Sequence, residues 1–223
     1  MKWVINAGTG ELEPINSAKL NLGQRFNLGG LAGRVGFSRG TPQRLSLIDN
    51  LKGIEVKFSS NINKKIGVVI AGSAGGGIQS AAKMLAQAGI LSGLHASMKG
   101  EYPITVGTGF SAAEVILSKK PINFSGLEKP NVVIAVTDDG WKKIKNRISS
   151  NSKVFVDSKI IADQLFDSKE FLKLGGKKGA ALTSVAYWIK ESGVFPIEAL
   201  LAVIEGHKHE KSLRKSIKSA ETL

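Results

Sequence analysis

The most constraining stretch of the sequence runs from Lys64 to Leu85, where an apolar segment ends at a glycine-rich turn and an alanine-rich segment follows at once. The apolar segment, IGVVIAG, is continuous and β-branched, which is typical of a strand buried on both faces of a parallel sheet. The next segment, GIQSAAKMLAQAGILSG, has apolar residues at helical spacing and ends at Gly93. A buried strand joined to a helix by a tight turn predicts an α/β fold.

The pattern continues along the chain. Further strands are predicted at LHASM, AAEVILS, NVVIAV and KVFVDS, and helices at 141–148, 177–193 and 196–206. This alternation predicts a three-layer α/β/α sandwich with a mostly parallel sheet, whose ligands would bind at the carboxyl ends of the strands.

Three segments differ in composition. Residues 1–62 are rich in Gly, Asn and Arg without sustained periodicity, and are interpreted as an extended basic arm that orders against a partner. Residues 63–207 form the expected α/β domain. Residues 208–223 have a polar, basic helical pattern and are expected to be an exposed helix or a docking segment.

Composition narrows the function. The chain has 223 residues and no cysteine, so it can hold neither a thiolate-ligated cluster nor a thiol nucleophile. No segment is apolar enough to cross a membrane and no leader is recognised, so a cytoplasmic protein is expected. The net charge of +13 requires an acidic partner, but the 6% aromatic content disfavours nucleic acid. His207 and His209 would not share a helix face and are interpreted as solvated side chains.

The glycine turn is the first candidate site, because missing β-carbons let backbone N–H groups at a helix start approach an anion. It reads G-x-x-G-G-G, which matches neither the dinucleotide fingerprint nor the P-loop. The acidic residue that would bind a ribose about 20 positions later is also missing. A self-contained NAD-binding module is therefore disfavoured.

The segment IAGSAGGGIQSAAKMLAQAGI resembles the opening of the gamma subunit of 2-oxoacid:acceptor (pyruvate, ketoisovalerate, 2-oxoglutarate) ferredoxin oxidoreductases. The segments EYPITVGTGFSAAEVILSKKPI, LEKPNVVIAVTDDGWKKI and GAALTSVAYWIKESGVFPIEALLAVIE follow in the family's order, so the resemblance covers about residues 65–206. Two departures indicate a divergent member. Gly76 stands where the family has glutamine, and 104–109 lacks the family's Pro-Glu-x-Arg-Gly-Gly core.

The resemblance implies that different subunits have different roles in the oxidative decarboxylation of a 2-oxoacid. Thiamine diphosphate is expected between alpha- and beta-type subunits and iron–sulfur clusters on other chains, which pass electrons to ferredoxin or another acceptor. This chain would bind no cofactor alone and supply no catalytic side chain. It would contribute structure, water exclusion and, where coenzyme A is the acyl acceptor, part of its enclosure.

The candidate binding residues lie in two segments. The turn contributes Gly72, Ser73, Gly75, Gly76 and Gly77, and the following loop contributes Tyr102, Thr105, Thr108 and Ser111. Ser73 could donate to a phosphate, but helix capping is the favoured interpretation. The loop is equally well interpreted as an ordinary turn. Lys83 and Lys99 could attract phosphates or simply be solvated, and Asp138 and Asp139 are expected to cap a helix.

Two other functions remain open from the sequence. A free-standing nucleotide- or coenzyme-binding domain would bind its ligand without partners. A nucleic-acid-binding protein would use the Arg/Gly arm and lose affinity steeply with salt, but no recognised motif supports it.

Overall fold

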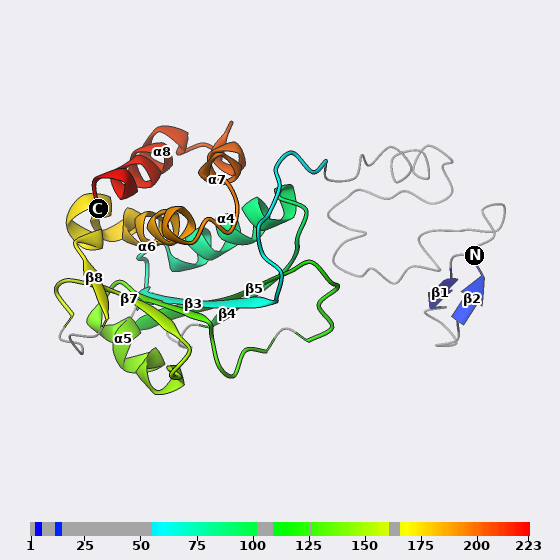
Figure 1. Ribbon diagram of the computed structural model, residues 1–223, viewed down its shortest axis with the longest axis horizontal. Helices are drawn as coiled ribbons and strands as arrows, with labels where there is room; N and C mark the ends of the chain where they lie inside the picture. The colour runs from blue at the N-terminus through cyan, green and yellow to red at the C-terminus, as the bar shows by residue number, and fades with distance from the viewer. Residues whose placement is uncertain (1–2, 6–11, 15–54, 102–108, 125, 161–165) are drawn as a thin grey trace. The chain divides into compact units, whose positions relative to one another are not determined.

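Strand β3 (Ile66–Ser73) lies inside the sheet, with Val68, Val69 and Ile70 fully buried. The computed structural model describes residues 3–5, 12–14, 55–101, 109–124, 126–160 and 166–223 (Figure 1). The chain divides into the units Met1–Gly53 and Ile54–Leu223. In the first unit the described residues form an antiparallel pair, β1 (Trp3–Ile5) and β2 (Leu12–Pro14).

The second unit contains a six-stranded sheet in the order β4-β5-β3-β6-β7-β8. Its other strands are β4 (His95–Glu101), β5 (Phe110–Ser118), β6 (Val132–Ala135), β7 (Lys153–Asp157) and β8 (Asp167–Lys169). Strands β3, β6, β7 and β8 pair in parallel, while β5 is antiparallel to both of its neighbours. The predicted mostly parallel sheet is therefore confirmed, with β5 as the reversed strand.

Helices cover both faces of the sheet, as predicted (Figure 1). Helices α4 (Ile78–Leu91), α6 (Phe171–Ser192), α7 (Ile197–Ile204) and α8 (Glu210–Ser219) cover one face. Helix α5 (Asp138–Ile144) covers the other, followed by a 3₁₀ turn over Lys145–Arg147. The helix predicted over 141–148 therefore begins and ends a few residues earlier than expected, since α5 spans Asp138–Ile144.

Two hydrophobic cores follow from these layers. The larger lies under α4, α6 and α7 and includes Phe155, Phe171 and Trp188; the smaller lies under α5 and includes Val69, Val133 and Ile144. Within the described ranges, no helix is both long and apolar enough to cross a bilayer.

Helix α6 contains a break that the sequence pattern did not reveal. Gly176 has φ 66° and ψ 177°, which is not helical, so the helix consists of a short first segment and a long second one. The long segment ends as predicted at Gly193, which adopts the left-handed conformation. The break brings the backbone of Lys177 and Lys178 against the β3–α4 turn.

Helix α8 is part of the packed structure. Ile217 of α8 and Ala220, which follows the helix, are buried in the larger core. Thr183 Oγ1 on α6 donates a hydrogen bond to the carbonyl of Ser216 at 2.9 Å. The expected exposed helix at 208–223 is therefore wrong in this respect: its basic face is exposed, but its apolar face packs on α6.

Candidate functional site

The β3–α4 turn has the shape that its glycines predict. Gly75 and Gly77 have φ values of 74° and 76°, in the left-handed region that favours glycine. A Cβ at Gly77 would overlap the carbonyl oxygen of Lys178, and one at Gly76 would lie 2.8 Å from the carbonyl oxygen of Ser73. The turn is therefore closely approached by the chain's own backbone.

Part of the turn's hydrogen-bonding capacity is used internally. Ala74 N–H donates to the carbonyl of Gly109 at 2.8 Å, and Gly76 N–H donates to that of Ser73 at 3.0 Å. Helix α4 begins after Gly77, and no side chain caps its first amides. The amides available to a ligand thus belong to the helix start rather than to the whole turn.

Ser73 does not cap α4. Its hydroxyl lies 3.0 Å from Thr137 Oγ1 and donates to Asp139 Oδ2 at 2.9 Å, both at the β6–α5 junction. Asp138 and Asp139 lie in the first turn of α5, as expected, but their side chains make no cap hydrogen bond: Asp138 pairs with Lys142 at 2.9 Å instead. Both capping predictions are therefore wrong, because these side chains find partners across the sheet edge or along the helix.

The crevice between β3 and β6 is closed. In open α/β sheets a ligand crevice is expected where the chain reverses its direction of winding, which here is between these two strands. A Cβ at Gly140, in the first turn of α5, would overlap the backbone of Gly72. Helix α5 therefore packs directly on the end of β3 and leaves no room there.

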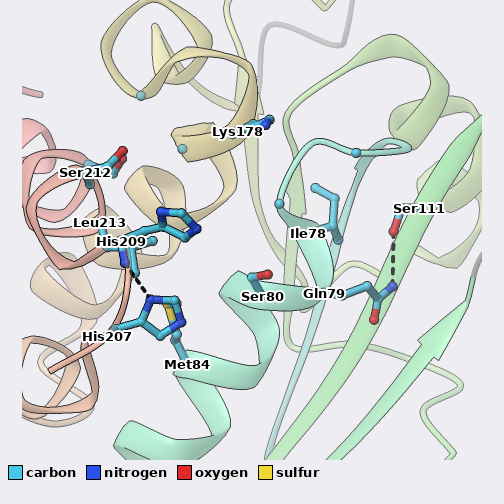
Figure 2. Close-up of a pocket in the computed structure, with 15 residues that line it drawn as sticks. Ile78, Gln79, Ser80, Met84, Ser111, Lys178, His207, His209, Ser212 and Leu213 are labelled. Carbon is cyan, nitrogen blue, oxygen red and sulfur yellow. Dashed lines mark hydrogen bonds between the residues drawn. The ribbon is translucent and has the colours of Figure 1, made fainter. Parts of the chain in front are cut away.

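A cavity of about 570 Å³ opens instead between α4, α6 and α8 (Figure 2). Its walls come from the β3–α4 turn with the start of α4, from the start of β5, from the break in α6, and from the α7–α8 loop with α8. The lining residues are Gly75, Gly77, Ile78, Gln79, Ser80, Met84, Ser111, Gly175, Lys178, Gly179, His207, His209, Ser212, Leu213 and Ser216.

The structure separates the predicted site residues. Gly75, Gly77 and Ser111 line the cavity. Gly72 and Gly76 are buried away from it, and Ser73 points to α5. Tyr102, Thr105 and Thr108 lie outside the described residues. Ser111 Oγ accepts a hydrogen bond from Gln79 Nε2 at 3.1 Å, so α4 and β5 are joined beside the cavity.

Sequence reasoning missed the opposite wall. Lys178, His207 and His209 are exposed and line the cavity, whereas Lys83 and Lys99 are exposed and do not line it. The two histidines precede α8 in a loop, so their helix spacing did not apply. His209 N–H donates to His207 Nδ1 at 3.1 Å, and the ring centroids are 6.0 Å apart. The sequence signal that could have located this wall is LGGKKG at 174–179, a second glycine-rich break with adjacent lysines.

Charges around the α7–α8 loop are mostly paired or basic. Glu210 accepts hydrogen bonds from Arg214 Nη2 at 2.9 Å and from Gly206 N–H at 3.0 Å, and these contacts lower the pKa of its carboxyl. No group of three or more metal-ligating side chains occurs in the part of the chain that the structure describes. The cavity lining combines hydrogen-bond donors with the positive charge of Lys178.

Comparison with known proteins identifies the family. The family described as pyruvate ferredoxin/flavodoxin oxidoreductase matches residues 67–221. The chain belongs to this family. The resemblance drawn from the glycine turn and the segments after it is thereby confirmed, and it extends through α8.

Relatives in this family include 2-oxoglutarate synthase subunit KorC of Archaeoglobus fulgidus, which is 26% identical over 98 residues. The match covers 44% of this chain and 52% of the relative, so the chain spans about half the length of that protein.

Solved structures share the fold. The gamma subunit of keto/oxoacid ferredoxin oxidoreductase from Geobacter sulfurreducens has a TM-score of 0.58 at 18% identity, covering 71% of this chain and 97% of that one. Pyruvate oxidoreductase subunit PORC from Thermotoga maritima has a TM-score of 0.56 at 18% identity with the same coverage. The 2-oxoglutarate:ferredoxin oxidoreductase of Magnetococcus marinus, solved with coenzyme A and succinyl-CoA bound, has a TM-score of 0.60 at 16% identity, covering 73% of this chain and 32% of that one.

Proposed function

We propose that this chain is the gamma-type subunit of a thiamine-diphosphate-dependent 2-oxoacid:acceptor oxidoreductase that oxidatively decarboxylates a 2-oxoacid. The observation that carries the proposal is the family match over residues 67–221, which spans the sheet and all four helices on its larger-core face. The fold also covers 97% of a gamma subunit from Geobacter sulfurreducens, so a protein of this shape occurs as a separate chain in such an enzyme.

The cofactors would be held by partner chains. Thiamine diphosphate supplies the carbanion chemistry and iron–sulfur clusters accept the electrons. This chain has no cysteine, so it cannot ligate a cluster through thiolates. The partners would be alpha-, beta- and cluster-carrying subunits, with ferredoxin or another acceptor reached through the complex, in the cytoplasm.

The contribution of this chain would be on the acceptor side. Gly75, Gly77 and Ser111 line the open side of the β3–α4 turn, where uncapped amides begin α4. Such a wall can bind an anionic group of the acyl acceptor and exclude water while contributing no acid, base or nucleophile. That a neighbour of the same fold was solved with coenzyme A bound supports coenzyme A as the acceptor.

A native pull-down of the tagged chain tests the proposal. Expected co-purifying chains carry thiamine diphosphate and iron in stoichiometric amounts, measured by thiochrome fluorescence and metal analysis. A chain recovered alone from cells grown on several carbon sources would contradict it. It would then favour a free-standing coenzyme-binding domain, which calorimetric titration with NAD(P), FAD, ATP and coenzyme A would detect.

A further inference from the structure

Strand β4 forms one edge of the six-stranded sheet. It is seven residues long, every one of them at least partly exposed, and among the described strands it pairs only with β5. Alternate residues of an edge strand direct their backbone N–H and C=O groups away from the sheet. The opposite edge is much shorter, because β8 has only three residues. Strand β4 therefore offers the longer row of backbone groups to which another extended segment could pair.

A groove of about 520 Å³ opens beside the start of this edge. Its apolar surface comes from Ile90 and Leu94 around the end of α4 and from Pro121 and Ile122 after β5, and residues 95–97 of β4 complete the lining. In peptides that add to a sheet edge, backbone hydrogen bonds supply affinity and pockets for alternate side chains supply specificity. The groove and the edge of β4 therefore provide both parts of such a site.

Lysines are concentrated at this end of the sheet. Lys64 and Lys65 precede β3, Lys119 and Lys120 follow β5, and Lys129 precedes β6. These five positions share one end because β5 is antiparallel to β3 and β6 is parallel to it. Strand β4 begins at the same end, since its first residue pairs with the last residue of β5. All five lysines are exposed, and none forms an ion pair with another described residue.

The charge of this end indicates which kind of segment fits the edge. The connecting segments 63–65 and 119–131 contain five lysines and a single glutamate. Complementary charge steers association, whereas like charge opposes it. A second copy of this chain would bring the same net charge of +13, so repulsion disfavours it as the occupant. An acidic segment from a different protein is therefore favoured.

We propose that the edge of β4 binds an extended acidic segment of a partner protein, which adds to the sheet as a further strand. The backbone of the segment would pair with β4, its apolar side chains would enter the groove, and its carboxylates would face the lysines. This surface lies at the end of the sheet opposite to the β3–α4 turn, so it is separate from the acceptor side. The inference does not rest on the proposed function, because an acidic segment of any partner would make the same contacts.

Titration of the full-length chain with a probe peptide tests this inference. The probe is an acetylated and amidated peptide of alternating glutamate and valine, as long as β4, and the chain is labelled with ¹⁵N at histidine. At constant ionic strength, the ring resonances of His95, which lines the groove, should shift to saturation. Those of His207 and His209, which do not line it, should stay unchanged. The absence of a saturable shift, or equal shifts of all three rings, would overturn the proposal.

N-methylation of the probe distinguishes strand addition from general attraction. The N-methylated peptide keeps its charges and side chains but cannot donate backbone hydrogen bonds, so it should bind about tenfold more weakly. Equal affinities of the two peptides would show attraction of any polyanion, including nucleic acid, and would contradict the proposal. A shift of the His95 resonance with the concentration of the chain alone would show that a second copy occupies the edge, and would contradict it as well.

Two pairs of adjacent lysines provide matched variants. Lys119→Gln/Lys120→Gln removes two charges next to the groove and should weaken binding of the probe about fivefold. Lys177→Gln/Lys178→Gln removes the same charge from α6, outside this groove, and should change binding by less than about twofold. All four side chains are exposed, so both variants should fold. Equal losses would show general attraction to a chain of net charge +13 and contradict the site.

Discussion

At the scale of a single residue, Gly77 contributes both to the packing of the fold and to the wall of the cavity. Its positive φ places the start of α4, and its missing side chain admits the Lys178 carbonyl from α6. Gly206 offers a comparison, because its φ of 72° is similar but a Cβ there would meet nothing within 4 Å. Comparing substitutions at these two positions therefore distinguishes the effect of backbone strain from the effect of another element's close approach.

Substitution by alanine should therefore have different effects at these positions. Gly206→Ala should lower the free energy of unfolding by about 1 kcal/mol, the cost of a left-handed alanine. Gly77→Ala adds an overlap with a backbone carbonyl that cannot rotate away, so its loss should be about 3 kcal/mol. Urea denaturation measures both, and equal losses would show that α6 does not approach the turn as closely as described.

A second feature at the residue scale is the mostly buried ion pair between Arg147 and Glu114. Arg147 Nη2 lies 2.7 Å from Glu114 Oε1 on β5 and also donates to the carbonyl of Leu127. Glu114 is buried, and its Oε2 has no hydrogen-bond partner among the residues that the structure describes. The arginine is thus the principal partner of a carboxylate that is shielded from water.

Removing the arginine should be costly. Arg147→Met leaves the Glu114 carboxylate buried without its cation, and the free energy of unfolding should fall by about 3 kcal/mol. Lys142→Met, which breaks the exposed pair with Asp138, serves as the control and should change stability little. If the double variant Glu114→Leu/Arg147→Met were no more stable than Arg147→Met, the buried charge would not be the cause.

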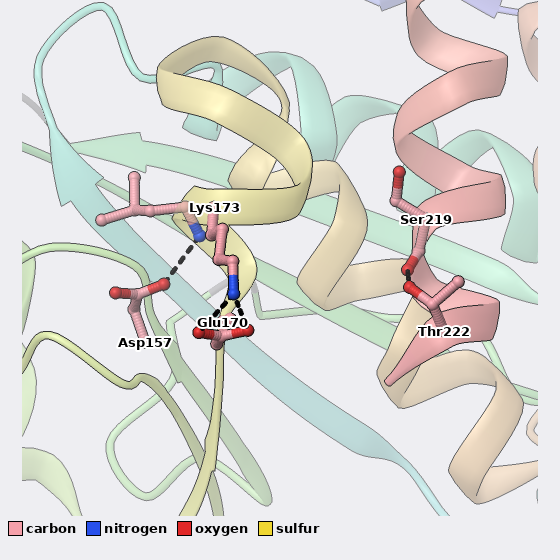
Figure 3. Close-up of polar contacts among 6 residues, drawn as sticks. Asp157, Glu170, Lys173, Ser219 and Thr222 are labelled. Atoms are coloured by element: carbon pink, nitrogen blue, oxygen red, sulfur yellow. Dashed lines mark hydrogen bonds and ion pairs between the residues drawn. The ribbon is translucent and has the colours of Figure 1, made fainter.

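At the scale of elements, α6 depends on a side chain from the neighbouring strand. Asp157 ends β7 and is almost fully buried. Its Oδ2 accepts a hydrogen bond from the N–H of Leu172 in the first turn of α6, at 2.7 Å (Figure 3). Its Oδ1 accepts one from Lys159 N–H at 3.0 Å. The carboxylate therefore acts as a cap supplied from outside the helix.

Asp157→Ala should lower the free energy of unfolding by about 2 kcal/mol, because two amides lose their partner and one is at a helix start. Asp157→Asn keeps an acceptor and should lose less. The exposed pair of Lys173 and Glu170 in the same turn provides the control, since Glu170→Gln should have little effect. Thermal unfolding followed by circular dichroism measures all three, and an unchanged midpoint for Asp157→Ala would exclude the capping role.

The elements differed in how far the sequence predicted them. Strands β3, β6 and β7 are buried on both faces, so their continuous apolar runs were readable. Strand β8 is the polar segment DSK and forms a strand only by pairing with β7, which leaves no periodic signal. The reversal of β5 was readable, because the segment joining it to β4 is shorter than the dozen residues of a parallel crossover.

The candidate site was only half predictable. The glycine turn is contiguous in the sequence, so Gly75 and Gly77 were found from their spacing. Lys178 and the histidines belong to segments about a hundred residues later, and only the packing of α6 on α4 and α8 brings them to the turn. Such long-range contacts depend on glycines that admit a neighbouring backbone, whose partner a sequence pattern does not specify.

At the scale of the whole molecule, the chain combines a net charge of +13 with a fold shared by gamma subunits and with no cysteine. A basic surface favours association with acidic partners, and a chain without thiolates must leave cluster ligation to them. These properties are compatible with the proposed role, in which this chain shapes part of a reaction chamber and partner chains hold the cofactors.

The most direct measurement is 2-oxoacid-dependent reduction of methyl viologen by the purified partner subunits, with and without this chain, across pyruvate, 2-oxoglutarate and branched 2-oxoacids. The account predicts that the chain alone is inactive with every substrate and that the partners need it for full turnover. Reduction by the chain alone, or undiminished turnover by partners that lack it, would contradict the account.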